Sequence, residues 1–290
     1  MQAGKRIITG TSTMVSMLIE LFALAPIRRG FFAFLAAGMT FPLIGLFVVV
    51  MNLFPLRFTL MHGALLGGVI GLLTGSEGIL FPLIVNLIIA ALLGPASDRM
   101  KLDVSNTSVL FMMGTIATAF FIIDRANLPA MEAFSVFWGS IYALTTADLV
   151  VLYALSAAIP IFMILNRRRI NAVLFDRDIA FSTGIDSRRF FYIILMLTGT
   201  VVAVSMKIVG ALLTDSLLIL PALAALSLAK SMRGMFVISV VFGFLSALFG
   251  FLFSLVMEVQ PGPAVTLVSL VLFAGFYAIQ AIQNRKGVSA

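Results

Sequence analysis

The sequence is dominated by apolar runs that are long enough to cross a lipid bilayer. A membrane-spanning helix needs about 20 mostly apolar residues, and only helices and closed barrels satisfy all their backbone polar groups in lipid. Of the 290 residues, 61% are hydrophobic and only 11% are charged, whereas a soluble domain has about 25% charged residues. We therefore expect an all-α, polytopic membrane protein, with residues 1–290 forming one transmembrane domain.

Nine stretches are predicted as membrane spans. Residues 1–30 are assigned to an N-terminal interfacial segment, because the apolar part of 12–25 is too short to cross comfortably. A total of eight spans, or a tenth crossing by 12–25, remains an open alternative. The nine predicted spans are 31–53, 58–73, 79–94, 106–123, 147–165, 190–206, 206–230, 235–257 and 264–282.

Basic residues set the predicted orientation, because Lys and Arg are retained on the cytoplasmic side of a membrane. Residues 166–189 carry six arginines and are assigned to a cytoplasmic loop. Counting spans back from this loop puts Arg57 at a cytoplasmic helix end, and puts Arg28 and Arg29 outside, against the rule. Lys207 is expected at the outer interface, with its amine in water. The net charge of +7 therefore reflects membrane orientation and does not indicate nucleic-acid binding.

The stretch from Met206 to Lys230 has features that a simple membrane anchor would not keep. Gly210 and Pro221 interrupt it, and Asp215 lies between them. An ionisable side chain inside a bilayer is costly unless it faces a partner or a wet cavity. Irregular backbone at this depth likewise needs protein or water to satisfy it. We therefore expect this stretch to pack against, or to line, a passage.

The sequence carries no signature of a soluble enzyme. It has no phosphate-binding loop and no HExxH or GxSxG motif. It also has no Cys and only one His, so thiolate metal sites are excluded and no stably bound cofactor is expected. If the chain moves a solute against a gradient, either another protein hydrolyses ATP or a coupling ion is used. An intramembrane enzyme is disfavoured.

A short helix is predicted in the cytoplasmic loop. Asp176 is a candidate N-cap, and Gly184 suits the position just past the C-terminus. Phe175, Ile179 and Ala180 give this helix one apolar face. Such a face fits a groove in a soluble partner. The alternative is that the helix lies on the lipid interface.

Several blocks of sequence, in order over roughly residues 30–280, resemble the permease family of ABC importers for zinc, manganese and ferrous iron. The strongest resemblance is in MKIVGALLTDSLLILPA (206–222). The other blocks are FLAAGMTFPLIGLFVVV (34–50), MHGALLGGVIG (61–71), FWGSIYALTTADL (137–149), FDRDIAFSTGI (175–185) and QPGPAVTLV (260–268).

The resemblance implies a subunit of a homodimeric or heterodimeric pore in a bacterial plasma (inner) membrane. ATP-binding subunits would dock inside, and an extracytoplasmic binding protein would deliver a divalent metal ion or a metal-containing ligand. Besides these proteins, membrane lipid is the expected partner. The chain itself would not be an enzyme, since ATP hydrolysis belongs to a separate subunit. The resemblance further implies that the ATP-binding subunit contacts Phe175, Asp176, Asp178, Ala180 and Gly184.

The resemblance also places His62 in the substrate pathway, where it would bind a metal transiently, with Met61 beside it. Family members usually carry an Asp one helical turn before this His, whereas this chain has Phe58. Asp215 occurs where the family generally has a small or apolar residue. We hypothesise that Asp215 supplies the missing carboxylate from another helix. The alternatives are that His62 is packed against a backbone carbonyl and that Met61 is structural.

A second functional class remains open. The chain could be a self-contained secondary transporter, with Asp215 and His62 forming the site for a coupling ion. Such a protein would support gradient-driven flux on its own in vesicles, whereas a permease subunit would not.

Overall fold

The structure is a computed structural model that describes residues 20–76, 78–129, 131–132, 139, 144–175 and 177–288. Within these residues there are helices and short links but no strands. Eight of the helices are long and apolar enough to cross a membrane, which confirms the predicted all-α membrane fold. They are α2 (Ala25–Val50), α3 (Phe54–Leu73), α4 (Leu80–Met100), α5 (Val104–Arg125), α7 (Thr146–Leu165), α10 (Ser187–Leu228), α11 (Met232–Met257) and α12 (Pro261–Val288).

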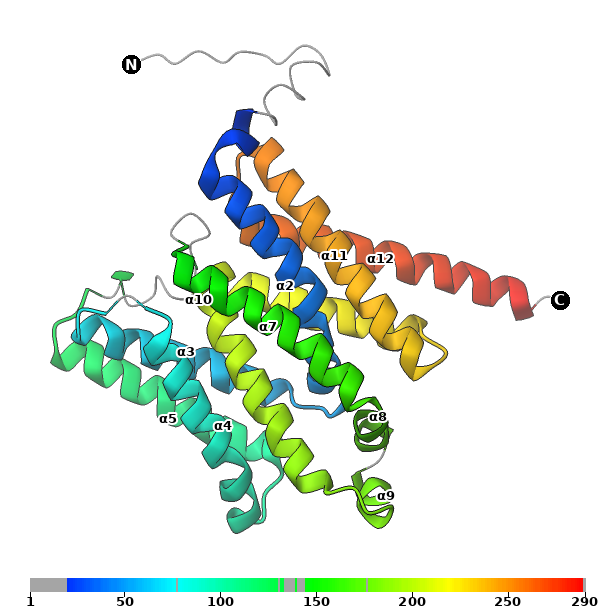
Figure 1. The fold of residues 1–290 in the computed structure, drawn as a ribbon, viewed down its shortest axis with the longest axis horizontal. Coiled ribbons are helices and arrows are strands. Elements are labelled where there is room, and N and C mark those ends of the chain that lie inside the picture. Colours follow the sequence, from blue (N-terminus) through cyan, green and yellow to red (C-terminus); the bar gives the residue numbers. More distant parts are fainter. Residues whose placement is uncertain are drawn as a thin grey trace.

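The longest helix, α10, is broken at Gly210. This residue has a φ of 78° and a ψ of 173°, a combination that is essentially limited to glycine. The segments before and after it run in different directions (Figure 1). α10 therefore supplies two of the predicted spans, 190–206 and 206–230, and all nine predicted segments are found in the described part of the chain.

α2 forms the centre of the bundle, where it packs against α7, α10 and α11. Glycines let the helix backbones approach closely, as is typical of membrane bundles. A β-carbon on Gly45 would lie 1.6 Å from the Leu218 carbonyl oxygen of α10. One on Gly38 would lie 2.6 Å from the Gly243 carbonyl oxygen of α11. The two halves of the chain are thus joined through direct backbone contact.

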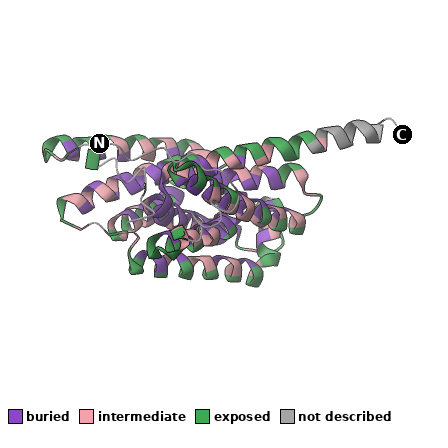
Figure 2. Cartoon of the chain, turned by 90° about the horizontal axis from the view of Figure 1, so that it is seen from above, coloured by how far each residue is buried: buried purple, intermediate pink, exposed green. Residues whose placement is uncertain are grey.

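The outer helices expose large apolar side chains. Phe121 on α5, Ile164 on α7 and Val271 on α12 are 69%, 73% and 71% exposed. Figure 2 shows the buried residues gathered in the middle of the bundle and the exposed ones on its outer faces. Exposed apolar area on this scale indicates contact with lipid or with another protein.

α2 and α3 begin six and four residues earlier than predicted, the largest differences at the starts of the helices. α2 starts at Ala25, with Pro26 in its first turn, a position that proline favours. Residues 25–30 of the predicted interfacial segment therefore belong to α2, and residues 1–19 lie outside the described part. α3 starts at Phe54, so Arg57 lies within the helix and not in the link before it.

Candidate functional site

α3 carries both pathway candidates from the first half of the chain. The His62 Nδ1 atom lies 2.7 Å from the Phe58 carbonyl oxygen, one turn earlier. Because a carbonyl oxygen only accepts hydrogen bonds, Nδ1 is the protonated nitrogen and Nε2 is the one that can act as a ligand. The His62 side chain is half-buried, whereas Met61 is 5% exposed and packs in the hydrophobic core.

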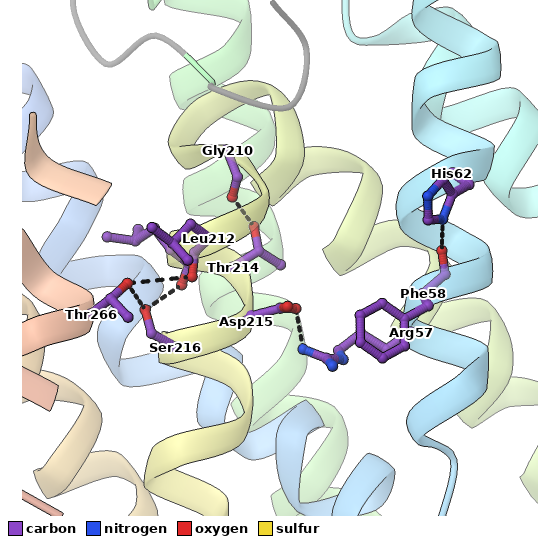
Figure 3. A network of polar contacts seen from close by, with 10 residues as sticks. Arg57, Phe58, His62, Gly210, Leu212, Thr214, Asp215, Ser216 and Thr266 are labelled. Carbon is purple, nitrogen blue, oxygen red and sulfur yellow. Dashed lines mark hydrogen bonds and ion pairs between the residues drawn. The ribbon is translucent and has the colours of Figure 1, made fainter. Parts of the chain in front are cut away.

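Asp215, on the second segment of α10, forms an ion pair with Arg57 of α3. Arg57 Nη1 contacts Asp215 Oδ1, and the two side chains are 9% and 29% exposed, respectively. Figure 3 shows them pointing toward each other between the two helices, with His62 further along α3. Each charge compensates the other at a depth where a single charge would be costly.

The surroundings of Arg57 add contacts that the sequence did not indicate. Arg57 lies at the start of α3, at a helix end as expected, and the residue is 7% exposed. Its Cζ atom lies 4.2 Å from the centroid of the Phe58 ring, a distance typical of a cation–π contact. The idea that Asp215 replaces the carboxylate absent at Phe58 stays a prediction, and in this structure the Asp215 carboxylate is bound by Arg57.

Hydroxyl groups support the backbone around the break in α10. Thr214 donates a hydrogen bond to the Gly210 carbonyl over 2.7 Å, and Ser216 donates to a carbonyl in the preceding turn. Thr266 of α12 lies 3.1 Å from the Ser216 hydroxyl. The Gly210 carbonyl at the break thus has a hydrogen-bond donor within the protein, as expected for a broken helix at membrane depth. Asp215 directly follows this donor, Thr214.

A second ion pair joins α7 to the first segment of α10. Lys207 Nζ lies 2.9 and 3.0 Å from the two carboxylate oxygens of Asp148, which is 1% exposed. Asp148 also forms a capping box with Thr145 at the start of α7. The Lys207 amine is therefore held by a carboxylate, and its side chain is 23% exposed. Its expected place at the outer interface stays a prediction. The TxxD pattern at 145–148 predicts the capping box. No pattern near Asp148 in the sequence predicts that Lys207 is its partner.

The link between α7 and α10 contains two short helices, α8 (Arg167–Phe175) and α9 (Arg177–Ser182). α9 ends as predicted at Gly184, which has a φ of 82°. The Gly184 N–H donates to the Phe181 carbonyl, and the Ile185 N–H donates to the Ala180 carbonyl. These two bonds form a Schellman cap.

The predicted contact face for the ATP-binding subunit is exposed in part. Phe175, Ile179 and Phe181 are 78%, 52% and 69% exposed, whereas Ala180 is buried. Asp176, and the side chain of Asp178, lie outside the described part of the structure. Beside Phe175 is a cavity of about 510 Å³, which is lined from the neighbouring ends of α2, α4, α5, α8 and α10. The expected role of this face is not tested by its geometry and stays a prediction.

In the described part of the chain, no three His, Asp or Glu side chains are grouped so that they could hold a metal ion. The transient metal contact at His62 likewise remains a prediction.

Ionisable groups paired between membrane helices, one of them broken, are a common feature of membrane transport proteins. The family model described as the ABC 3 transport family matches residues 24–280. The chain therefore belongs to this family, and it is a multi-pass membrane permease of the ATP-binding cassette type.

Relatives in this family cover most of the chain. The manganese transport system membrane protein MntC of Halalkalibacterium halodurans is 23% identical over 263 residues, which are 91% of this chain and 90% of the relative. The zinc uptake system membrane protein ZnuB of Haemophilus influenzae is 25% identical over 235 residues, 79% of this chain and 88% of the relative.

Two solved structures share the fold. PsaBC from Streptococcus pneumoniae, in complex with a Fab, aligns with a TM-score of 0.78 and 18% identity, covering 91% of this chain and 95% of its own. An inward-facing putative metal-chelate type ABC transporter aligns with a TM-score of 0.66 and 14% identity, covering 96% of this chain and 91% of its own.

Proposed function

We propose that this chain is the membrane-spanning subunit of an ATP-driven importer in a bacterial inner membrane, and that its cargo is a divalent metal ion. The observation that carries this proposal is the family match across residues 24–280, in which similar proteins are described as manganese and zinc transport permeases. Zinc, manganese and ferrous iron are the candidate cargoes, either bare or in a metal-containing ligand.

The cargo passes close to the contact of α3 with the second segment of α10. This contact holds the Arg57–Asp215 pair, and His62 lies on the same helix as Arg57. Imidazole nitrogen and carboxylate oxygen are ligands that suit these metals. A site that offers the metal ion only a few protein ligands binds it weakly and transiently. A transport pathway needs such weak binding in order to release its cargo.

ATP hydrolysis belongs to a separate subunit that docks on α8 and α9. The exposed Phe175, Ile179 and Phe181 side chains form an apolar surface beside the cavity at the ends of the long helices. An apolar helix face of this kind fits a hydrophobic groove in a partner. An extracytoplasmic binding protein that delivers the metal, and a second permease copy or a paralogue, complete the assembly.

Metal uptake by cells tests this function. We expect cells with the complete transporter to take up radioactive manganese or zinc, and cells without this chain to lose that uptake. Restoring the chain should restore uptake only if the ATP-binding subunit retains its hydrolytic activity. Uptake that survives an inactive ATP-binding subunit would contradict the proposal and favour the secondary transporter. Competition among manganese, zinc and ferrous iron then identifies the cargo.

A further inference from the structure

Two of the carboxylates that form ion pairs between membrane helices, Asp148 and Asp215, have different surroundings. Both oxygens of Asp148 lie within 3.0 Å of Lys207 Nζ, and Thr145 adds hydrogen bonds from its N–H and its hydroxyl. The Asp148 side chain is 2% exposed. Asp215 contacts Arg57 through Oδ1 and its side chain is 29% exposed. Asp148 is therefore enclosed, whereas the Asp215 side chain is partly exposed, with its Oδ1 atom buried against Arg57.

The Arg57 guanidinium contacts an aromatic ring as well as the Asp215 carboxylate. It lies over the Phe58 ring at 4.2 Å, and Phe58 is 41% exposed. The buried Arg57 Nε has no hydrogen-bond partner among the described residues, so the group is not held by a full set of bonds. An aromatic face stabilises a guanidinium that is partly removed from water. Arg57 can thus release the carboxylate and keep its contact with Phe58.

We propose that Arg57 is a tethered cation that competes with the transported metal ion for the Asp215 carboxylate. The guanidinium neutralises Asp215 when no cargo is present, and the arriving metal ion displaces it. Arg57 then returns and helps to release the metal. Arg57 therefore keeps the affinity of the Asp215 carboxylate for the cargo low. This inference rests on the proposed metal-import function.

Manganese binding to the purified permease tests the competition directly. The full-length chain in lipid nanodiscs is titrated with Mn²⁺, and binding is followed by electron paramagnetic resonance. We expect Arg57→Gln to bind Mn²⁺ at least about tenfold more tightly than the wild-type chain, because the carboxylate loses its internal counter-charge. Adding Asp215→Asn to Arg57→Gln should abolish this gain.

Lys207→Gln is the matched control, because it removes the cation of the enclosed ion pair. It should give no gain in Mn²⁺ affinity, since Asp148 is inaccessible. In the complete transporter, Arg57→Gln should lower both the KM and the maximal rate of manganese uptake. A purely structural role for Arg57 would lower the amount of active transporter without lowering KM.

Unchanged Mn²⁺ affinity in folded Arg57→Gln overturns the inference, and so does a gain that persists after Asp215→Asn. If Arg57→Gln does not fold, the single variant Asp215→Asn decides. If the KM for manganese of Asp215→Asn is raised about tenfold, the metal ion uses the carboxylate that Arg57 occupies, which supports the inference. An unchanged KM refutes the inference. Absence of manganese and zinc uptake by the wild-type transporter would instead contradict the proposed function. The binding titration separates the two failures, because it measures Mn²⁺ affinity without transport.

Discussion

The paired charges inside the bundle fix which helices can be neighbours. Asp148 and Lys207 connect α7 to α10, and Arg57 and Asp215 connect α3 to α10. A buried ion pair contributes little net stability compared with apolar packing, but removal of one partner leaves an uncompensated charge. Each pair therefore disfavours any arrangement of the helices that separates its members.

Removing the Lys207 amine should destabilise the protein. Lys207→Met leaves the Asp148 carboxylate buried and without its cation, so we expect the free energy of unfolding to fall by about 3 kcal/mol. The measurement is denaturant unfolding of the purified permease in detergent. The double variant Lys207→Met/Asp148→Asn should recover part of this loss. Equal losses in the single and double variants would show that the pair is not coupled.

The partners of these charged residues were beyond what the sequence could predict. A lone Lys or Arg near the end of an apolar run is typical of a membrane interface, and this pattern does not indicate that Arg57 and Lys207 pair with carboxylates of other helices. Asp215 was flagged correctly as a residue that needs a partner. Its partner lies on a helix far away in sequence, and no local pattern specifies which helices pack together.

Helix boundaries and breaks depend on local chemistry, and here the sequence was informative. The break at Gly210 and the cap at Gly184 were predicted, because both need a backbone conformation that glycine supplies. The interruption predicted at Pro221 is not found, since Pro221 lies inside the helical second segment of α10. The early starts of α2 and α3 were missed. Pro26 and Pro55 lie in the first turns of these helices, positions that proline favours.

The conformation of Gly210 should be intolerant of a side chain. Gly210→Ala places a β-carbon at a φ of 78°, which costs about 1–3 kcal/mol and misdirects the segment that carries Asp215. We expect a lower thermal unfolding midpoint and reduced metal uptake. Gly114→Ala is the matched control, because a β-carbon there meets no atom within 4 Å. An equal response of the two variants would show that the break is not required.

The apolar surface of α8 and α9 should be needed for assembly and not for folding. Phe175→Ser and Phe181→Ser each remove an exposed ring, so the permease should unfold at an unchanged temperature. Co-purification of the ATP-binding subunit should fall severalfold, because the rings would no longer fill its groove. Met257→Ser, 56% exposed at the far end of α11, is the control. Normal co-purification with both Phe variants would refute docking at this surface.

At the level of the whole molecule, α2 and α10 form a core from which the outer helices present apolar faces. α12 is the least enclosed long helix, with 17% of Pro261–Ala278 buried. Hydropathy predicted the class and the spans, because a bilayer admits few kinds of structure. The route of the cargo was not predictable from hydropathy, since it depends on which side chains meet between helices.

Reconstitution of the purified components tests the ATP-driven account most directly. Proteoliposomes containing this chain and its ATP-binding subunit, supplied with the binding protein, should take up radioactive manganese or zinc only when ATP reaches the ATP-binding subunit. Vesicles that contain this chain alone should show no uptake under a proton or sodium gradient. Gradient-driven uptake by the chain alone, with no requirement for ATP, would contradict the account.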